Sequence, residues 1–106
     1  MTRITTKVEE LGKMHIRSSD LHPHLLARMR QRGVTVEEME ETLNHGWEAS
    51  DVKPGTTGKV MVFDYEAEWE GQFYQEKEVT VYYKVTGAEV ILLTTKARYG
   101  HRFPRR

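Results

Sequence analysis

The chain has 106 residues, of which 38% are hydrophobic and 30% are charged, and this size and composition predict one folded domain. It contains no cysteine, which excludes disulfide bonds, zinc-thiolate sites, iron–sulfur clusters and thiol catalysis. Its 16 basic residues balance 16 acidic ones, so no net charge draws the whole molecule toward nucleic acid.

The sequence has no recognisable targeting or membrane segment. Residues 1–20 carry charges throughout and have no apolar core, which argues against a signal peptide. No stretch approaches the roughly 20 apolar residues of a membrane span, so we expect no membrane association. With the absence of cysteine, these features predict a cytoplasmic protein.

The N-terminal residues carry the weakest pattern in the chain. We predict that residues 1–12 form an arm of uncertain order, followed by a single domain over residues 13–106. In residues 13–17, Met14 and Ile16 alternate with charged or polar residues. This alternation predicts a short strand.

Residues 20–45 have the pattern of two short helices. In the first, Ser19 or Asp20 is the expected N-terminal cap, and Pro23 suits the first turn because its missing N–H costs nothing there. Gly33 is expected to end this helix. Its apolar residues recur at helical spacing: Leu21, Leu25, Leu26 and Met29.

The second helix begins with a capping box. Thr35 and Glu38 have the spacing at which each side chain binds the backbone N–H of the other. Gly46 follows the last residue of this helix. Its apolar side consists of Val36, Met39 and Leu43.

Residues 47–100 are rich in strand-forming residues. We predict a weak strand at 47–52, a loop at 53–58, and a hairpin turn near 70–72. The strongest strands are expected at 79–85 and 90–97, joined by a short turn over 86–89.

The last hairpin can be analysed by face, because side chains on a strand alternate. A turn at Gly87 and Ala88 sets the pairs Val85–Val90, Tyr83–Leu92, Val81–Thr94 and Val79–Lys96. This face is the more apolar, so we expect the helices to cover it. The opposite face would carry Glu78, Thr80, Tyr82, Lys84 and Tyr99. The predicted fold is α+β, with two short helices on one face of a curved, mainly antiparallel sheet.

Three basic side chains are four residues apart on the first helix. His24, Arg28 and Arg32 therefore lie along one side, next to the apolar stripe. Such a row suits an anion or phosphate site, since arginine binds oxygen atoms in pairs. The alternative is a solvated charged face.

The segment 96–106 is basic and contains the aromatic residues Tyr99 and Phe103. Basic residues interleaved with aromatic ones suit single-stranded nucleic acid, and the alternative is an ordinary solubilising end. Lys96 and Arg98 share a face and Tyr99 points away, so a single site that uses all three needs a β-bulge.

The remaining polar clusters leave alternatives open. The acidic stretch 64–78 suits a partner surface for a basic protein, an acid–base pair, or the wet face of a strand. His22 and His24 lie on different sides of the helix with no carboxylate at ligand spacing, so we predict no metal and no cofactor. His101, next to Arg102, is a candidate general acid.

Two segments together resemble the small bacterial and phage domain of unknown function 4258. They are HLLARMRQRGVTVEE at residues 24–38, and EKEVTVYYK at 76–84 followed by LTTKARYG at 93–100. That family is similar to the BrnT and RelE toxins. The resemblance implies two helices on a curved antiparallel sheet and a metal-independent, toxin-type ribonuclease.

The resemblance also implies where the site lies. His24, Arg28 and Arg32 match the helical motif and, with Arg102, would bind RNA or another anion. On the terminal strands, Glu78 or Lys96 would act as base, Arg98 as the cation, and Tyr99 or His101 as acid.

The implied partners are RNA or the ribosome, and a cognate antitoxin or another protein. A homodimer is also expected, because opposite charge patches can pair across a two-fold axis. The alternative function is a non-catalytic protein-interaction or dimerisation module. In an enzyme the basic and aromatic residues should converge on one cleft, whereas in a binding module they can lie apart.

Overall fold

The computed structural model describes residues 2–5 and 14–105, which form two helices and one sheet of five strands. All neighbouring strands are antiparallel, in the order β1-β5-β4-β3-β2. The elements in chain order are β1 (Thr2–Thr5), the 3-10 turn η1 (Ser18–Asp20), α1 (Pro23–Arg32), α2 (Val36–His45), β2 (Trp47–Glu48), β3 (Thr57–Trp69), β4 (Gln72–Thr86) and β5 (Glu89–Gly100).

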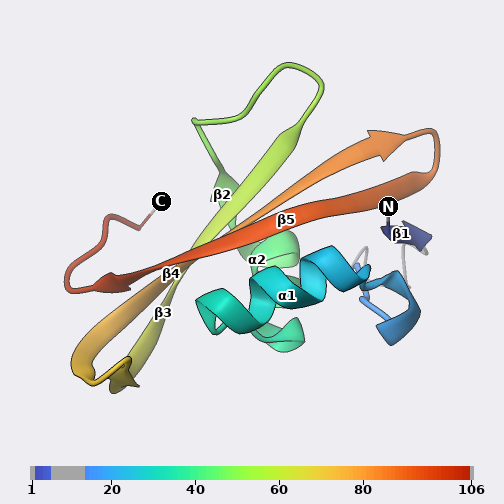
Figure 1. Cartoon of the computed structure of the whole chain (residues 1–106). Helices are drawn as coiled ribbons and strands as arrows, with labels where there is room; N and C mark the ends of the chain where they lie inside the picture. Colours follow the sequence, from blue (N-terminus) through green and yellow to red (C-terminus); the bar gives the residue numbers. More distant parts are fainter. Residues whose placement is uncertain (1, 6–13, 106) are drawn as a thin grey trace.

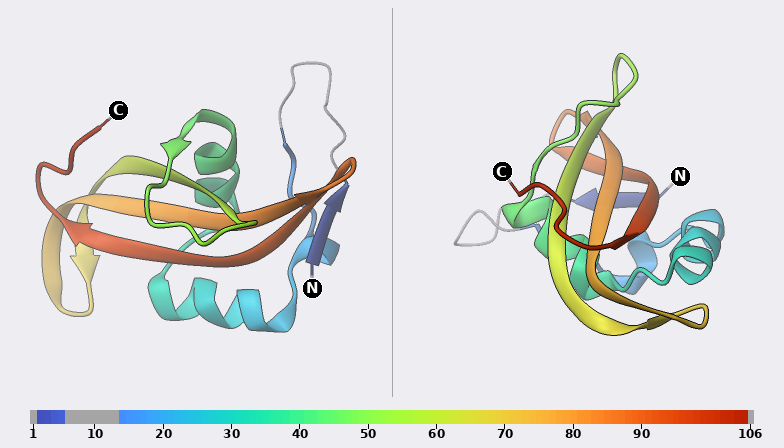
Figure 2. Two further views of the ribbon diagram at one scale, coloured as in Figure 1. Left: turned by 90° about the horizontal axis from the view of Figure 1, so that it is seen from above. Right: turned by 90° about the vertical axis from the view of Figure 1, so that its left-hand side faces the viewer.

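The predicted α+β architecture is confirmed. Both helices lie on one side of the sheet, below it in Figure 1, and the β2–β3 loop and the C-terminal tail lie on the other. The sheet is strongly twisted and remains open, as the end-on view of Figure 2 shows. One face is therefore buried under the helices, and the opposite face is available for a site.

The two helices begin and end where local chemistry dictates. The capping box at the start of α2 is confirmed, with the Thr35 hydroxyl accepting from the Glu38 N–H and the Glu38 carboxylate accepting from the Thr35 N–H. Gly33 ends α1 in the left-handed conformation at a φ of +71°. The predicted N-terminal cap of α1 is wrong, because His22 occupies that position and its Nδ1 accepts from the His24 N–H.

The helices bury an apolar core against β4 and β5. Met39, Val79 and Val81 are completely buried, and each such side chain stabilises the fold by ~1.5–3 kcal/mol. The other members of the core cluster are Ile16, Leu25, Met29, Val34, Leu43, Tyr83, Val90 and Leu92.

A buried lysine ties the junction of the helices to the sheet. The Lys77 side chain is 3% exposed, and its Nζ lies 2.8 Å from an oxygen of Glu38 and donates to the Gly33 carbonyl. The lysine thus satisfies a carbonyl at the C-terminal end of α1, where no intrahelical partner exists. Its charge is paired, as a buried cation requires.

The short strand predicted at residues 13–17 is wrong. Thr2–Thr5 forms β1 at the edge of the sheet, whereas residues 1 and 6–13 lie outside the described part of the chain. Residues 14–17 are irregular, not a strand. The backbone of Met14 is bound by the Asn44 side chain, and the Ile16 N–H by Glu40, so α2 supplies the hydrogen bonds that a neighbouring strand would have made.

The β4–β5 register was predicted correctly only near the turn. There Val85 pairs with Val90, and Tyr83 with Leu92. Beyond them Leu93 has no partner in β4, so Thr95 and not Thr94 lies opposite Val81. An extra residue in one strand moves every later side chain to the other face. The prediction that Lys96 faces the helices is therefore wrong.

The bulge exchanges the predicted faces of the basic and aromatic residues. Lys96 and Arg98 pair with Thr80 and Glu78, on the face opposite the helices. Tyr99, predicted for the open face, lies on the helix side instead. The bulge lies before all three residues, so it does not bring them into one site.

Candidate functional site

The open face of the sheet is built from successive cross-strand rows. One row runs across four strands through Trp47, Val60, Thr80 and Lys96. Side chains that are directly opposite one another point to the same side of the sheet. A polar and aromatic surface therefore crosses the middle of this face.

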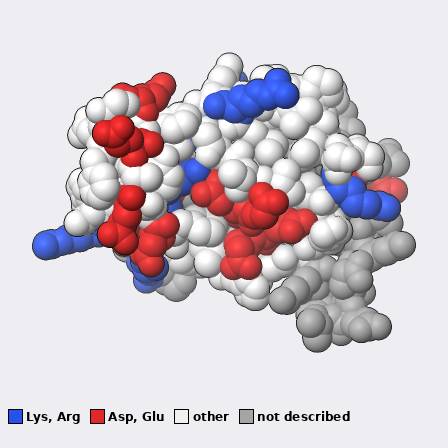
Figure 3. Space-filling view, turned by 90° about the horizontal axis from the view of Figure 1, so that it is seen from below, with Lys and Arg blue, Asp and Glu red and all other residues white. Residues whose placement is uncertain are grey.

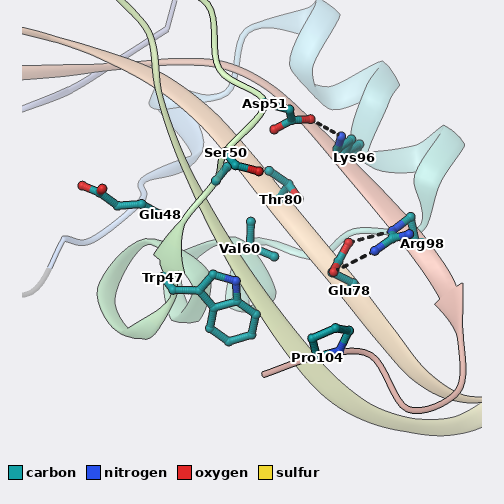
Figure 4. Close-up of a pocket in the computed structure, with 11 residues that line it drawn as sticks. Trp47, Glu48, Ser50, Asp51, Val60, Glu78, Thr80, Lys96, Arg98 and Pro104 are labelled. Carbon is teal, nitrogen blue, oxygen red and sulfur yellow. Dashed lines mark hydrogen bonds and ion pairs between the residues drawn. The ribbon is translucent and has the colours of Figure 1, made fainter. Parts of the chain in front are cut away.

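The surface is hollowed into a pocket of about 490 Å³ (Figure 4). The sheet supplies its floor, the β2–β3 loop one wall, and Pro104 of the C-terminal tail another. Three of the predicted catalytic residues, Glu78, Lys96 and Arg98, line it. The other lining residues are Trp47, Glu48, Ala49, Ser50, Asp51, Val60, Thr80 and Pro104.

Glu78 and Arg98 form a two-point ion pair within the pocket. Arg98 Nε donates to Glu78 Oε1 at 2.8 Å, and Nη2 donates to Oε2 at 3.1 Å. The carboxylate is 13% exposed and the guanidinium side chain 61% exposed. Arg98 thus keeps N–H donors that face solvent. Its hydrogen bonds to Glu78 raise the pKa of Arg98, so the cation persists at every working pH.

A second pair joins the β2–β3 loop to the sheet. Lys96 Nζ lies 2.7 Å from Asp51 Oδ2, and the Tyr82 hydroxyl donates to the same oxygen at 2.9 Å. The hydrogen bond from Lys96, reinforced by that from Tyr82, lowers the pKa of Asp51. The bond to Asp51 raises the pKa of Lys96. Both partners are therefore charged at neutral pH, and Lys96 places a second cation in the pocket beside Arg98.

The C-terminal tail folds back across the open face. The Phe103 N–H donates to Glu76 at 2.8 Å, and Arg105 binds both Glu76 and Asp64. The Phe103 ring also packs against the Arg98 guanidinium, 4.9 Å from centroid to Cζ. These contacts fix the wall that Pro104 forms, and they bring the Phe103 ring against Arg98.

Tyr99 lies away from the pocket, in an aromatic cluster. Its ring stacks on Trp69 at 4.9 Å with an interplanar angle of 10°, and Tyr65 and Tyr74 pack around it. Its hydroxyl donates to the Arg32 carbonyl at 2.5 Å. Burial strongly raises the pKa of Tyr99. This environment suits a residue that fixes the end of α1 to the sheet, and it disfavours proton transfer.

The other predicted site residues also lie outside the pocket lining. His24, Arg28 and Arg32 belong to α1, on the helix side of the molecule. His101 follows β5, and its Nδ1 accepts from the Gln75 N–H at 3.4 Å. Arg102 is exposed in the tail. The structure thus brings three of the nine predicted residues into one pocket and disperses the remainder.

The helix side carries strong negative charge. Figure 3 shows acidic side chains gathered over α2 and over the β3–β4 hairpin. Glu66, Glu68 and Glu70 in that hairpin are all exposed, which confirms that their alternation marks the wet side of a strand. This charge repels a polyanion from the side on which the α1 arginines lie.

Two pocket residues were missed by sequence reasoning. Trp47 stands directly after the glycine that ends α2, in a strand of only two residues. An aromatic residue at the entry to a sheet was the available signal. Asp51 lies in the β2–β3 loop, and nothing in its local sequence indicates that it binds Lys96.

The described residues contain no cluster of three or more side chains that could hold a metal ion. In the same part of the chain, no helix is long and apolar enough to cross a membrane. Comparison of the sequence and structure with protein-family models, curated proteins and solved structures finds no match.

Proposed function

We propose that this α+β domain is a RelE/BrnT-like, metal-independent ribonuclease whose active site is the pocket on the open face. The observation that carries the proposal is the Glu78–Arg98 pair, with Lys96 beside it in the same pocket. A carboxylate next to two cations supplies a base and a site for phosphate.

In the proposed reaction, Glu78 removes the proton from a ribose 2′-OH. The 2′-oxygen then attacks the adjacent phosphorus, and the bond from phosphorus to the 5′-oxygen breaks. Arg98 stabilises the charge that develops on the phosphoryl oxygens. Lys96 Nζ gives a proton to the leaving 5′-oxygen, so that the products are a 2′,3′-cyclic phosphate and a 5′-hydroxyl. Proton exchange with water returns both side chains to their starting state.

The test is cleavage of a 5′-labelled single-stranded RNA in the presence of EDTA, with and without ribosomes. We expect cleavage by the wild type and a loss of roughly a hundredfold or more in Arg98→Ala. Arg30→Ala is the matched control, because it removes an exposed arginine on the helix side and should leave the rate unchanged. Folded wild-type protein that cuts neither free nor ribosome-bound RNA would refute the proposal.

A non-catalytic interaction module is the second candidate function. It is favoured by the pairing of both pocket cations with carboxylates, and by the distance of Tyr99 from the pocket. In this case the surface would bind a protein partner or pair two subunits. Light scattering at two salt concentrations tests whether two subunits pair, and a monomer at both concentrations would exclude the dimer.

A further inference from the structure

We propose that the Trp47 indole is a nucleobase subsite, on which a base of single-stranded RNA stacks next to the scissile phosphate. This inference rests on the proposed ribonuclease function and adds the part of the substrate that the pocket recognises. Figure 4 shows the indole facing into the pocket, on the side away from Lys96 and Arg98.

The position of Trp47 follows from the sheet register. Trp47 pairs with Val60, which pairs with Thr80, so two strand spacings separate the indole from the strand that carries Glu78. Neighbouring strands lie about 4.8 Å apart, which places β2 roughly 10 Å from β4 and roughly 14 Å from β5, the strand that carries Arg98. A base on the indole therefore places the adjoining phosphates over β4 and β5, where Glu78 and Arg98 lie.

The wall around Trp47 is chemically suited to a base. Val60 and Pro104 supply apolar surface to the pocket, and Ser50 supplies a hydroxyl group. A flat base needs an aromatic partner for its face and polar groups for its edge. The charged pairs lie at the opposite end, where a phosphate would bind.

The backbone that carries Trp47 is tightly held. Gly46 ends α2, and its N–H donates to the Thr42 carbonyl at 2.9 Å. A Cβ atom at Gly46 would collide with the carbonyl oxygen of Val60, so only glycine allows β2 to come this close to β3. Trp47 is the next residue, so its backbone is fixed between a capped helix and the sheet.

The test uses a fluorescently labelled 2′-O-methyl tetranucleotide, which lacks the free 2′-OH and cannot be cleaved by the proposed reaction. An abasic oligomer of the same length and charge is the reference ligand. We expect the wild type to bind the base-containing probe at least tenfold more tightly, as measured by fluorescence anisotropy. In Trp47→Ala this difference should disappear, while Trp47→Phe should retain most of it.

Equal binding of the two probes by the wild type would overturn the subsite, and so would a base preference that persists in Trp47→Ala. If Trp47→Ala does not fold, binding of both probes to the wild type and to Trp47→Phe still shows whether the protein prefers the base-containing probe. Base-dependent binding without RNA cleavage would retain the subsite and refute the nuclease. RNA cleavage without a preference for the base-containing probe would support the nuclease and refute the subsite.

Discussion

Gly33 occupies a position at which a single methyl group should be costly. Its φ of +71° is one that residues with a Cβ atom rarely adopt. Placing alanine in this backbone conformation alone costs roughly 1–2 kcal/mol. A Cβ atom there would lie 2.5 Å from the Trp69 ring and 2.7 Å from the Tyr99 hydroxyl. Relieving such overpacking costs typically about 1–3 kcal/mol. Gly33→Ala should therefore lower the free energy of unfolding by about 2–5 kcal/mol.

Gly87 provides the matched control for this substitution. Its φ is +61°, and a Cβ atom there would meet nothing within 4 Å. Gly87→Ala should consequently incur only the backbone cost of roughly 1–2 kcal/mol. Urea unfolding of the two variants and the wild type separates the backbone strain from the clash. If Gly33→Ala is no less stable than Gly87→Ala, the packing described for the helix junction is wrong.

Three further predictions concern buried or paired groups. Glu38→Gln should lower the free energy of unfolding by about 2 kcal/mol, because it leaves the Lys77 cation without its charged partner; a change under about 0.5 kcal/mol in urea unfolding would contradict this. Burial raises the pKa of Tyr99, so the folded state retains a proton that the unfolded state releases, and stability should fall as pH rises above about 10. The slope of unfolding free energy against pH should be shallower there in Tyr99→Phe, and an unchanged slope would argue against the partial burial of this phenol. The pKa of the Asp51 carboxyl should lie below its usual value of 3.8, and in Lys96→Met it should rise toward that value. The NMR chemical shift of the carboxyl carbon, followed against pH, measures the pKa in both proteins. Equal pKa values in the wild type and in Lys96→Met would refute the contact between the loop and Lys96.

Local sequence patterns predicted the structure correctly wherever the contacts that determine it join residues close in sequence. The Thr35–Glu38 capping box and the glycine end of α1 involve neighbours within one turn, and both are present in the structure. The alternation of Val79 and Val81 correctly predicted the face that the helices bury. These features together made the α+β class predictable.

The candidate site was less predictable, because it depends on one bulge and one loop. Leu93 lies within an unbroken apolar run, and no glycine or turn residue there signals the extra residue. Its effect is nevertheless decisive, since it moves Lys96 and Arg98 to the open face. The contact between Asp51 and Lys96 joins residues 45 positions apart, which no local pattern encodes.

The central claim is that Glu78 acts as a base in metal-free RNA cleavage. The direct measurement is the rate of 2′,3′-cyclic phosphate formation from single-stranded RNA in EDTA, followed by phosphorus NMR. Glu78→Gln should abolish this product, whereas Glu76→Gln should not, although both carboxylates lie on β4 and bind an arginine. Cyclic phosphate formed by Glu78→Gln at the wild-type rate would contradict the proposed mechanism.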